Sequence, residues 1–78
     1  MPTVVTEGRF QFKVNLREND YEPPHVHVWV HNDDVCRINL DNGEFLDNPP
    51  PGDGRAIVEV YARHAEEIRK CWDETHRR

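Results

Sequence analysis

The chain has 78 residues, of which 36% are hydrophobic and 32% charged, and its formal net charge at pH 7 is −5. A chain this short forms one domain, residues 1–78, and buries only about 60 to 65% of the surface that its unfolded form exposes. No run is apolar enough to cross a membrane, and the first residues have no basic segment followed by an apolar one. We therefore expect no membrane association and no secretory signal, and we assign the protein to the cytoplasm.

The first regular pattern is an alternation of polar and apolar residues between Arg9 and Leu16. Successive side chains of a strand point to opposite faces, so the alternation predicts a strand with one buried face. The apolar side holds Phe10, Phe12, Val14 and Leu16, and the polar side holds Arg9, Gln11, Lys13 and Asn15.

A second alternation covers residues 23–31, with the sequence Pro-Pro-His-Val-His-Val-Trp-Val-His. The two prolines keep the backbone extended and prevent a helix at this point. The pattern predicts a central strand with its valines in the core. Its other side holds His25, His27, Trp29 and His31.

Residues 31–34 have the composition of a turn, and alternation resumes over residues 35–40 with Cys36, Ile38 and Leu40 toward the core. We expect a hairpin in which Val30 lies opposite Cys36, Val28 opposite Ile38 and Trp29 opposite Arg37. Asn42-Gly43 is typical of a type I′ turn, and residues 44–46 would then form a short fourth strand.

The periodicity changes after a proline-rich connector, residues 47–54. From residue 55 to about residue 76 the apolar residues follow steps of three and four, which predicts one amphipathic helix with Asp53 as its N-cap. Cys36 and Cys71 lie on the apolar sides of their segments, so we expect them to pack in the core as free thiols.

Together these segments predict an α+β fold. Residues 9–46 form a three- to four-stranded antiparallel sheet, and the single C-terminal helix packs on one face of it. The opposite face of the sheet is left open. We expect a monomer or a weak homodimer.

The polar side of the predicted sheet is the candidate binding surface. Its candidate binding residues are Arg9, Lys13, His25, His27, Trp29, His31 and Arg37. We place every acidic residue in loops, turns or the helix, so this face is expected to be locally basic despite the negative net charge. It would suit an acidic partner protein, a peptide strand or single-stranded RNA stacking on Trp29, and the alternative is an ordinary solvated face.

His25 and His27 allow two chemical interpretations. Imidazoles at positions i and i+2 of a strand lie roughly 7 Å apart, which is compatible with one metal ion, with His31, His64 or Glu22 as a third ligand. They would also serve as the acid and base of RNA cleavage. Neither the metal site nor the proton-transfer pair has a clearly identified third residue, so we assign no metal and no cofactor. We interpret His64 as structural and His76 as solvated.

The Pro-Pro-His-Val-His-Val run, together with residues 1–4 and 64–74, resembles a family of small bacterial domains of unknown function that carry this motif. The resemblance spans most of the chain. It implies one half of a two-gene cassette of the toxin/antitoxin type, with a small partner protein encoded by a neighbouring gene, and it implies no activity. Asp20 is followed by Tyr21, where members commonly carry a histidine.

Two functional hypotheses follow from the sequence. The first is a noncatalytic protein-interaction module that uses the open sheet face to bind the partner of such a cassette. The alternative is an RNA-binding protein or a metal-independent ribonuclease in which His25 and His27 transfer the proton.

Overall fold

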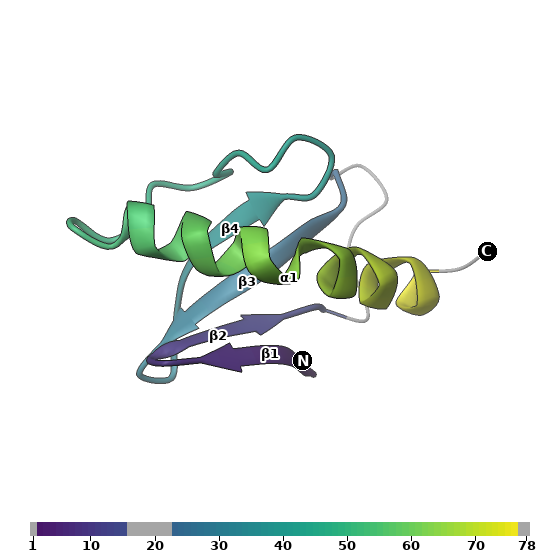
Figure 1. Ribbon diagram of the computed structural model, residues 1–78, viewed down its shortest axis with the longest axis horizontal. Coiled ribbons are helices and arrows are strands. Elements are labelled where there is room, and N and C mark those ends of the chain that lie inside the picture. The colour runs from purple at the N-terminus through teal and green to yellow at the C-terminus, as the bar shows by residue number, and fades with distance from the viewer. Residues whose placement is uncertain (1, 16–22, 77–78) are drawn as a thin grey trace.

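The computed structural model describes residues 2–15 and 23–76 of the chain. Four strands precede a single long helix: β1 (Thr3–Glu7), β2 (Phe10–Lys13), β3 (His25–Val30), β4 (Asp33–Asn39) and α1 (Gly54–Thr75). The strands form one antiparallel sheet in the order β1-β2-β3-β4, and α1 crosses one face of it (Figure 1). The predicted α+β fold with one C-terminal helix is confirmed.

β1 is an edge strand that the sequence-based prediction did not contain. Two consecutive valines, Val4 and Val5, break the alternation that marks a strand. The structure accommodates them with a register shift between Thr3 and Val5 in the pairing of β1 with β2, a β-bulge that inserts one residue. Val5 then faces the core and is 7% exposed.

The first hairpin turn contains Gly8 and Arg9. Gly8 has φ of 60°, a conformation that glycine adopts without steric cost, and it is the first of two central residues as in a type II′ turn. The prediction that Arg9 begins a strand is therefore wrong. The Arg9 guanidinium forms an ion pair with Asp53 at the start of α1.

The hairpin between β3 and β4 differs from the predicted one. His31 and Asn32 both have positive φ, 51° and 66°, as the central residues of a type I′ turn. Asn42 does not have positive φ, so the type I′ turn predicted at Asn42-Gly43 is wrong.

Because the turn contains only two residues, β4 starts at Asp33, and Val30 pairs three positions before the predicted Cys36. The bulge that follows reduces the shift to two positions in the rest of the hairpin. Val28 pairs with Cys36, Val26 with Ile38 and His27 with Arg37, with a second register shift between Val28 and Trp29. The predicted pairs of Val30 with Cys36 and Trp29 with Arg37 are therefore wrong. The inward and outward assignment of Cys36 and Ile38 is unaffected, because a shift of two residues keeps every side chain on its face.

The core lies between the sheet and α1. Alternate residues of the strands supply most of it, and three residues of α1 cover them. The buried apolar residues are Val5, Phe10, Phe12, Val14, Val26, Val28, Cys36, Ile38, Ile57, Val60 and Ile68. The core faces predicted for β2, β3 and β4 are confirmed for most residues, although Val30 and Leu40 are only partly buried. Val5 and Val60 are buried without having been predicted, and Leu16 lies outside the described residues.

Residues 39–46 continue the chain beyond β4 and return beside it. The main-chain N–H of Asn39 donates to the carbonyl of Glu44 at 2.8 Å, and that of Leu46 donates to the carbonyl of Arg37 at the same distance. Ile38 and Phe45 form one isolated bridge. The predicted fourth strand over residues 44–46 is thus reduced to a single bridge.

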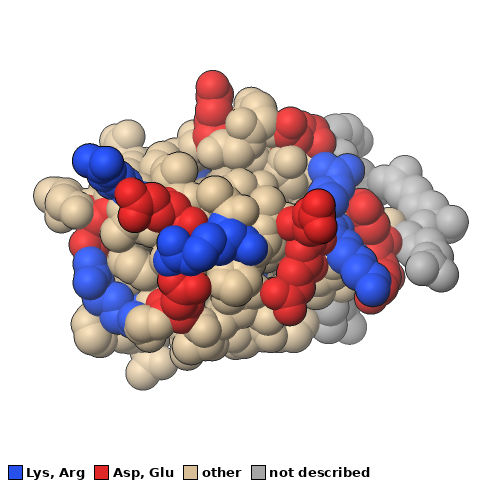
Figure 2. All heavy atoms as spheres, in the orientation of Figure 1, with Lys and Arg blue, Asp and Glu red and all other residues tan. Residues whose placement is uncertain are grey.

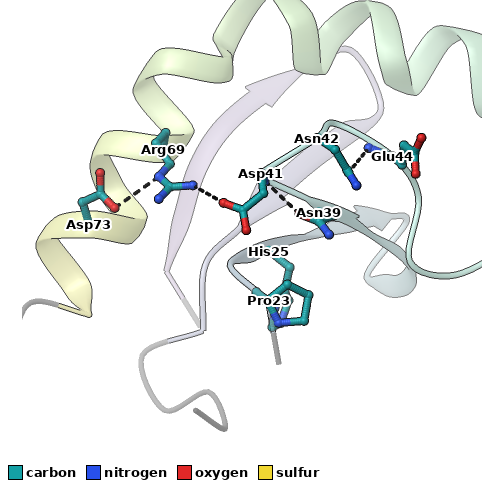
Figure 3. A network of polar contacts seen from close by, with 8 residues as sticks. All are labelled: Pro23, His25, Asn39, Asp41, Asn42, Glu44, Arg69 and Asp73. Atoms are coloured by element: carbon teal, nitrogen blue, oxygen red, sulfur yellow. Dashed lines mark hydrogen bonds and ion pairs between the residues drawn. The ribbon is translucent and has the colours of Figure 1, made fainter. Parts of the chain in front are cut away.

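Arg69 of α1 holds this turn in place (Figure 3). Its guanidinium donates to Asp41 at 3.0 Å and to Asp73, one helical turn further on, at 3.2 Å. Asn39 and Asn42 close the loop locally, because their side-chain oxygens accept from the main-chain N–H groups of Asp41 and Glu44. The turn is therefore attached to the helix as well as to the sheet.

The helix begins as predicted, with Asp53 at the N-cap. The Asp53 side chain makes no capping hydrogen bond, and its carboxylate pairs with Arg9 instead. The surface that carries α1 shows acidic and basic side chains interspersed (Figure 2). In the part of the chain that the structure describes, no helix has the length and apolar character to span a membrane.

Candidate binding face

We define the open face as the side of the sheet opposite α1. Its cross-strand neighbours follow from the register: Lys13 pairs with His27, which pairs with Arg37. In the adjacent row Gln11 pairs with Trp29, which pairs with Asp34. Two rows of polar and aromatic side chains therefore run across the three inner strands.

The most prominent contact on this face joins Lys13 and Trp29. The Lys13 Nζ lies 4.1 Å from the centroid of the indole ring, which is a cation–π geometry. The indole Nε1 is buried and makes no hydrogen bond to a described residue. A buried N–H without an acceptor costs about 1–3 kcal/mol.

One hydrogen bond and one ion pair flank the aromatic contact. His27 donates from Nδ1 to the Asp34 carboxylate at 2.9 Å. Arg37 donates to both carboxylate oxygens of Asp47, at 2.8 and 3.2 Å. The hydrogen bonds from Arg37 hold the pKa of the Asp47 carboxyl below its usual value.

These two contacts border a hollow of about 540 Å³. It is lined by Asn15, His27, Asp34, Val35, Cys36, Arg37 and Asp47. The hollow is therefore bordered by the Arg37 guanidinium, the Asp34 and Asp47 carboxylates and the His27 imidazole.

The open face is not free of acid, and the prediction of a locally basic face is wrong. Asp34 belongs to β4 rather than to a turn, because the two-residue turn ends at Asn32. Asp47 arrives from the connector and pairs with Arg37. Among the described residues, the charges of Lys13 and Arg37 are thus balanced by two carboxylates.

His25 does not lie on the accessible part of this face. Its side chain is fully buried, and its Nδ1 donates to the carbonyl of Pro23 at 2.8 Å. The His25 ring centroid lies 5.1 Å from that of His27 and 5.4 Å from that of Trp72 on α1. The prediction that His25 is exposed beside His27 is therefore wrong.

His76 is also placed differently from the prediction. Its ring stacks on Trp72 with centroids 3.7 Å apart, and its Nδ1 donates to the Trp72 carbonyl at 3.1 Å. The ring is partly buried rather than solvated. Rings of His27, His25, Trp72 and His76 therefore follow one another from the sheet to the last turn of the helix.

The remaining predicted residues lie away from the centre of the open face. Arg9 is in the first turn, and His31 is exposed in the turn between β3 and β4. His64 is part of a separate cluster on α1, where its Nε2 donates to Glu7 at 3.0 Å. Glu22 lies outside the described residues.

The described residues do not assemble a metal centre. No group of three or more His, Cys, Asp or Glu residues in residues 2–15 and 23–76 is arranged to hold a metal ion. Cys36 reaches the wall of the hollow, but burial raises the pKa of its thiol to about 11. It therefore stays protonated at neutral pH and is a poor nucleophile.

Sequence reasoning missed the two carboxylates of the face. A signal for Asp34 exists, since a two-residue turn at His31 and Asn32 would have placed it in a strand. No local signal exists for Asp47, because its contact with Arg37 bridges residues 10 positions apart through the loop geometry of residues 39–46.

Comparison of this chain with curated proteins and with solved structures returns no match. Comparison with protein families returns one, whose description is "Domain of unknown function (DUF4160)", over residues 9–73. The matched segment contains β2, β3, β4 and nearly all of α1, so it includes both rows of polar and aromatic side chains on the open face. The chain therefore belongs to this family, as its resemblance to small domains of unknown function predicted.

Proposed function

We propose that the protein is a noncatalytic protein-interaction module that binds a partner protein on the open face of its sheet. The observation that carries the proposal is the contact between Lys13 and Trp29, at 4.1 Å, on the sheet face opposite α1. Tryptophan is enriched among the residues that dominate binding energy at protein interfaces.

The unsatisfied indole N–H supports the same proposal. It is buried beneath its neighbours and lacks an acceptor among the described residues. A partner carbonyl that enters as Lys13 moves aside would supply that acceptor and recover the cost of burying the group. Binding would then satisfy an atom that folding leaves unsatisfied.

The charge balance of the face favours a protein over a nucleic acid. Lys13 and Arg37 face two carboxylates, Asp34 and Asp47, one of which is bound bidentately. Binding to phosphates requires a surplus of positive charge on the binding surface. Burial of His25 also weighs against the His25/His27 pair as a proton-transfer pair for RNA, because a buried ring cannot contact a substrate.

The partner implied by the resemblance is a small protein encoded by an adjacent gene, as in a two-gene cassette of the toxin/antitoxin type. The experiment is calorimetry of the wild-type protein and two variants, Trp29→Ala and Arg37→Glu, with the purified product of that gene. Trp29→Ala should weaken binding by about thirtyfold, which corresponds to roughly 2 kcal/mol at an interface hot spot. Arg37→Glu should weaken it further, because it places a third carboxylate beside Asp34 and Asp47.

The matched control is Arg55→Glu, the same charge reversal at a residue whose side chain is 93% exposed at the start of α1. It should bind like the wild type, and circular dichroism should show all variants folded. Wild-type binding by a folded Trp29→Ala, Arg37→Glu double variant contradicts the proposal, and so does the absence of wild-type binding.

The same titration includes single-stranded RNA as a separate probe. RNA binding that saturates and weakens steeply with salt would show that the partner is a nucleic acid and not a protein. The salt dependence is diagnostic because phosphate contacts release counterions. Cleavage of that RNA, lost in His27→Ala, would establish the ribonuclease alternative.

A further inference from the structure

The two edge strands of the sheet, β1 and β4, differ in whether another segment pairs with their outer side. Beyond β4, residues 44–46 cover part of the edge through the hydrogen bonds of Glu44 and Leu46 and the bridge at Phe45. Beyond β1, none of residues 2–15 and 23–76 forms a further strand. β1 lies along the lower margin of the sheet in Figure 1, away from the connector.

The outer side of β1 presents main-chain groups for pairing. In a two-residue hairpin the residues flanking the turn form a hydrogen-bonded pair, and the next pair along the strands is not hydrogen-bonded. Here Glu7 and Phe10 flank Gly8 and Arg9, and the next pair is Thr6 with Gln11. The N–H and C=O of Thr6 therefore point outward, and Thr6 is exposed.

β1 has some of the devices that block strand addition at edges, because it is short, contains one bulge and carries one charge, but it lacks others. It contains no lysine and no proline, and its bulge is confined to the end at Thr3 and Val5. Its only charged residue, Glu7, contacts the helix through an ion pair with Arg63 and a hydrogen bond from His64. The segment around Thr6 is therefore open to a neighbouring strand.

The surroundings of this edge carry more acid than base. The Arg63 guanidinium is influenced by the charges of both Glu7 and Glu59. Glu67 lies 3.6 Å from the Nδ1 of His64. The carboxylates of Glu7, Glu59 and Glu67 therefore outnumber the guanidinium groups of Arg55 and Arg63 by one in this cluster beside β1. A second copy of the chain would bring the same acidic surplus, so a cationic partner is favoured over self-association.

From these observations we propose that the outer edge of β1 accepts an extended, cationic segment of a protein partner as an additional antiparallel strand. Main-chain hydrogen bonds to Thr6 would supply affinity, and basic side chains of the added strand would face the carboxylates beside the edge. The inference rests on the proposed function in treating the chain as an interaction module, but it assigns a second surface.

The experiment uses soluble peptides of about ten residues, a length typical of longer strands. One alternates threonine with lysine, and its matched control alternates threonine with glutamate. The readout is amide hydrogen exchange and chemical-shift change of the full chain by NMR. The lysine peptide should slow exchange of the Thr6 amide at least tenfold and shift β1, and the glutamate peptide should do neither.

Two substitutions at one position test the hydrogen bond itself. Thr6→Pro removes the outward N–H and should abolish binding of the lysine peptide, and Thr6→Val keeps the N–H and should bind like the wild type. Proline is tolerated on edge strands, and thermal unfolding verifies that the variant folds. If a folded Thr6→Pro binds the peptide normally, or if Thr6 exchange is unchanged at saturation, the edge proposal is wrong.

Trp29→Ala distinguishes this proposal from the proposed function. It should bind the lysine peptide like the wild type, because Trp29 lies on the open face and not at the edge. Loss of peptide binding in that variant would mean that the peptide binds on the open face. The edge site would then be wrong, and the proposed function would be unaffected. Absence of peptide binding by a wild-type protein that still binds the adjacent gene product would overturn the edge site and leave the proposed function standing.

Discussion

Glu7 is the residue that ties the first strand to the helix through charge. Its carboxylate accepts hydrogen bonds from Arg63 and from the Nε2 of His64. These bonds, with Arg63 first, lower the pKa of Glu7 from 4.5 to about 2. The contacts lie at the surface, so they set how stability depends on pH rather than forming a major part of the folding free energy.

The sign of that dependence follows from the lowered pKa. A carboxyl group that binds protons more weakly in the folded state stabilises it above the unfolded pKa, and this contribution is lost as the pH falls from about 4.5 through about 2. We predict that Glu7→Gln reduces the difference in melting temperature between pH 5 and pH 2. The measurement is thermal unfolding across that range.

Glu66→Gln is the matched control, because Glu66 is exposed on α1 and the same charge is removed there. The melting temperature of Glu66→Gln should depend on pH nearly as that of the wild type does, whereas Glu7→Gln should differ from both. Identical profiles for wild type and Glu7→Gln would show that the ion pairs with Arg63 and His64 do not form in solution.

At the scale of the element, the β3–β4 hairpin depends on two residues in the left-handed region. His31 and Asn32 have φ of 51° and 66°, and neither is glycine. This conformation costs roughly 1–2 kcal/mol for most residues, and asparagine tolerates it best among those with a side chain. The turn therefore fixes the register of β4 at a conformational cost.

We predict that Asn32→Ala lowers the free energy of unfolding by roughly 1 kcal/mol. Asn32→Gly should remain within a few tenths of the wild type, because glycine adopts positive φ freely. Urea unfolding of the three proteins, with unchanged slope, provides the comparison. Equal stability of the alanine and glycine variants would mean that Asn32 is not held at positive φ.

The same hairpin shows where sequence reasoning reached its limit. The alternation of apolar residues was sufficient to predict the buried faces of β2, β3 and β4, and the spacing of Ile57, Ile68 and Trp72 to predict α1. The register depended on whether the turn has two residues or more, which alternation does not encode. Placing Asp34 in the turn rather than in β4 then gave the open face the wrong charge.

At the scale of the whole molecule, the pairings that link distant segments were beyond local pattern. Arg9 with Asp53, and Glu7 with Arg63, bridge 44 and 56 positions of sequence. Burial of His25 similarly depends on the approach of Trp72 from the far end of the chain. The helix, the strands and their buried faces can be predicted from short periodicities in the sequence. The chemistry of the candidate site depends instead on contacts between residues far apart in the sequence.

The turn over residues 39–44 also affects the rate at which the protein deamidates. Asn-Gly sequences lose ammonia when the glycine main-chain nitrogen attacks the asparagine side chain and closes a five-membered imide. Here the N–H of Gly43 donates to the Asn39 carbonyl at 2.8 Å, and the Asn42 side-chain oxygen accepts from the N–H of Glu44 at 2.9 Å. Both reacting groups are held in place, so the folded chain should deamidate at Asn42 more slowly than a peptide of residues 38–46, which mass spectrometry of stored samples would measure.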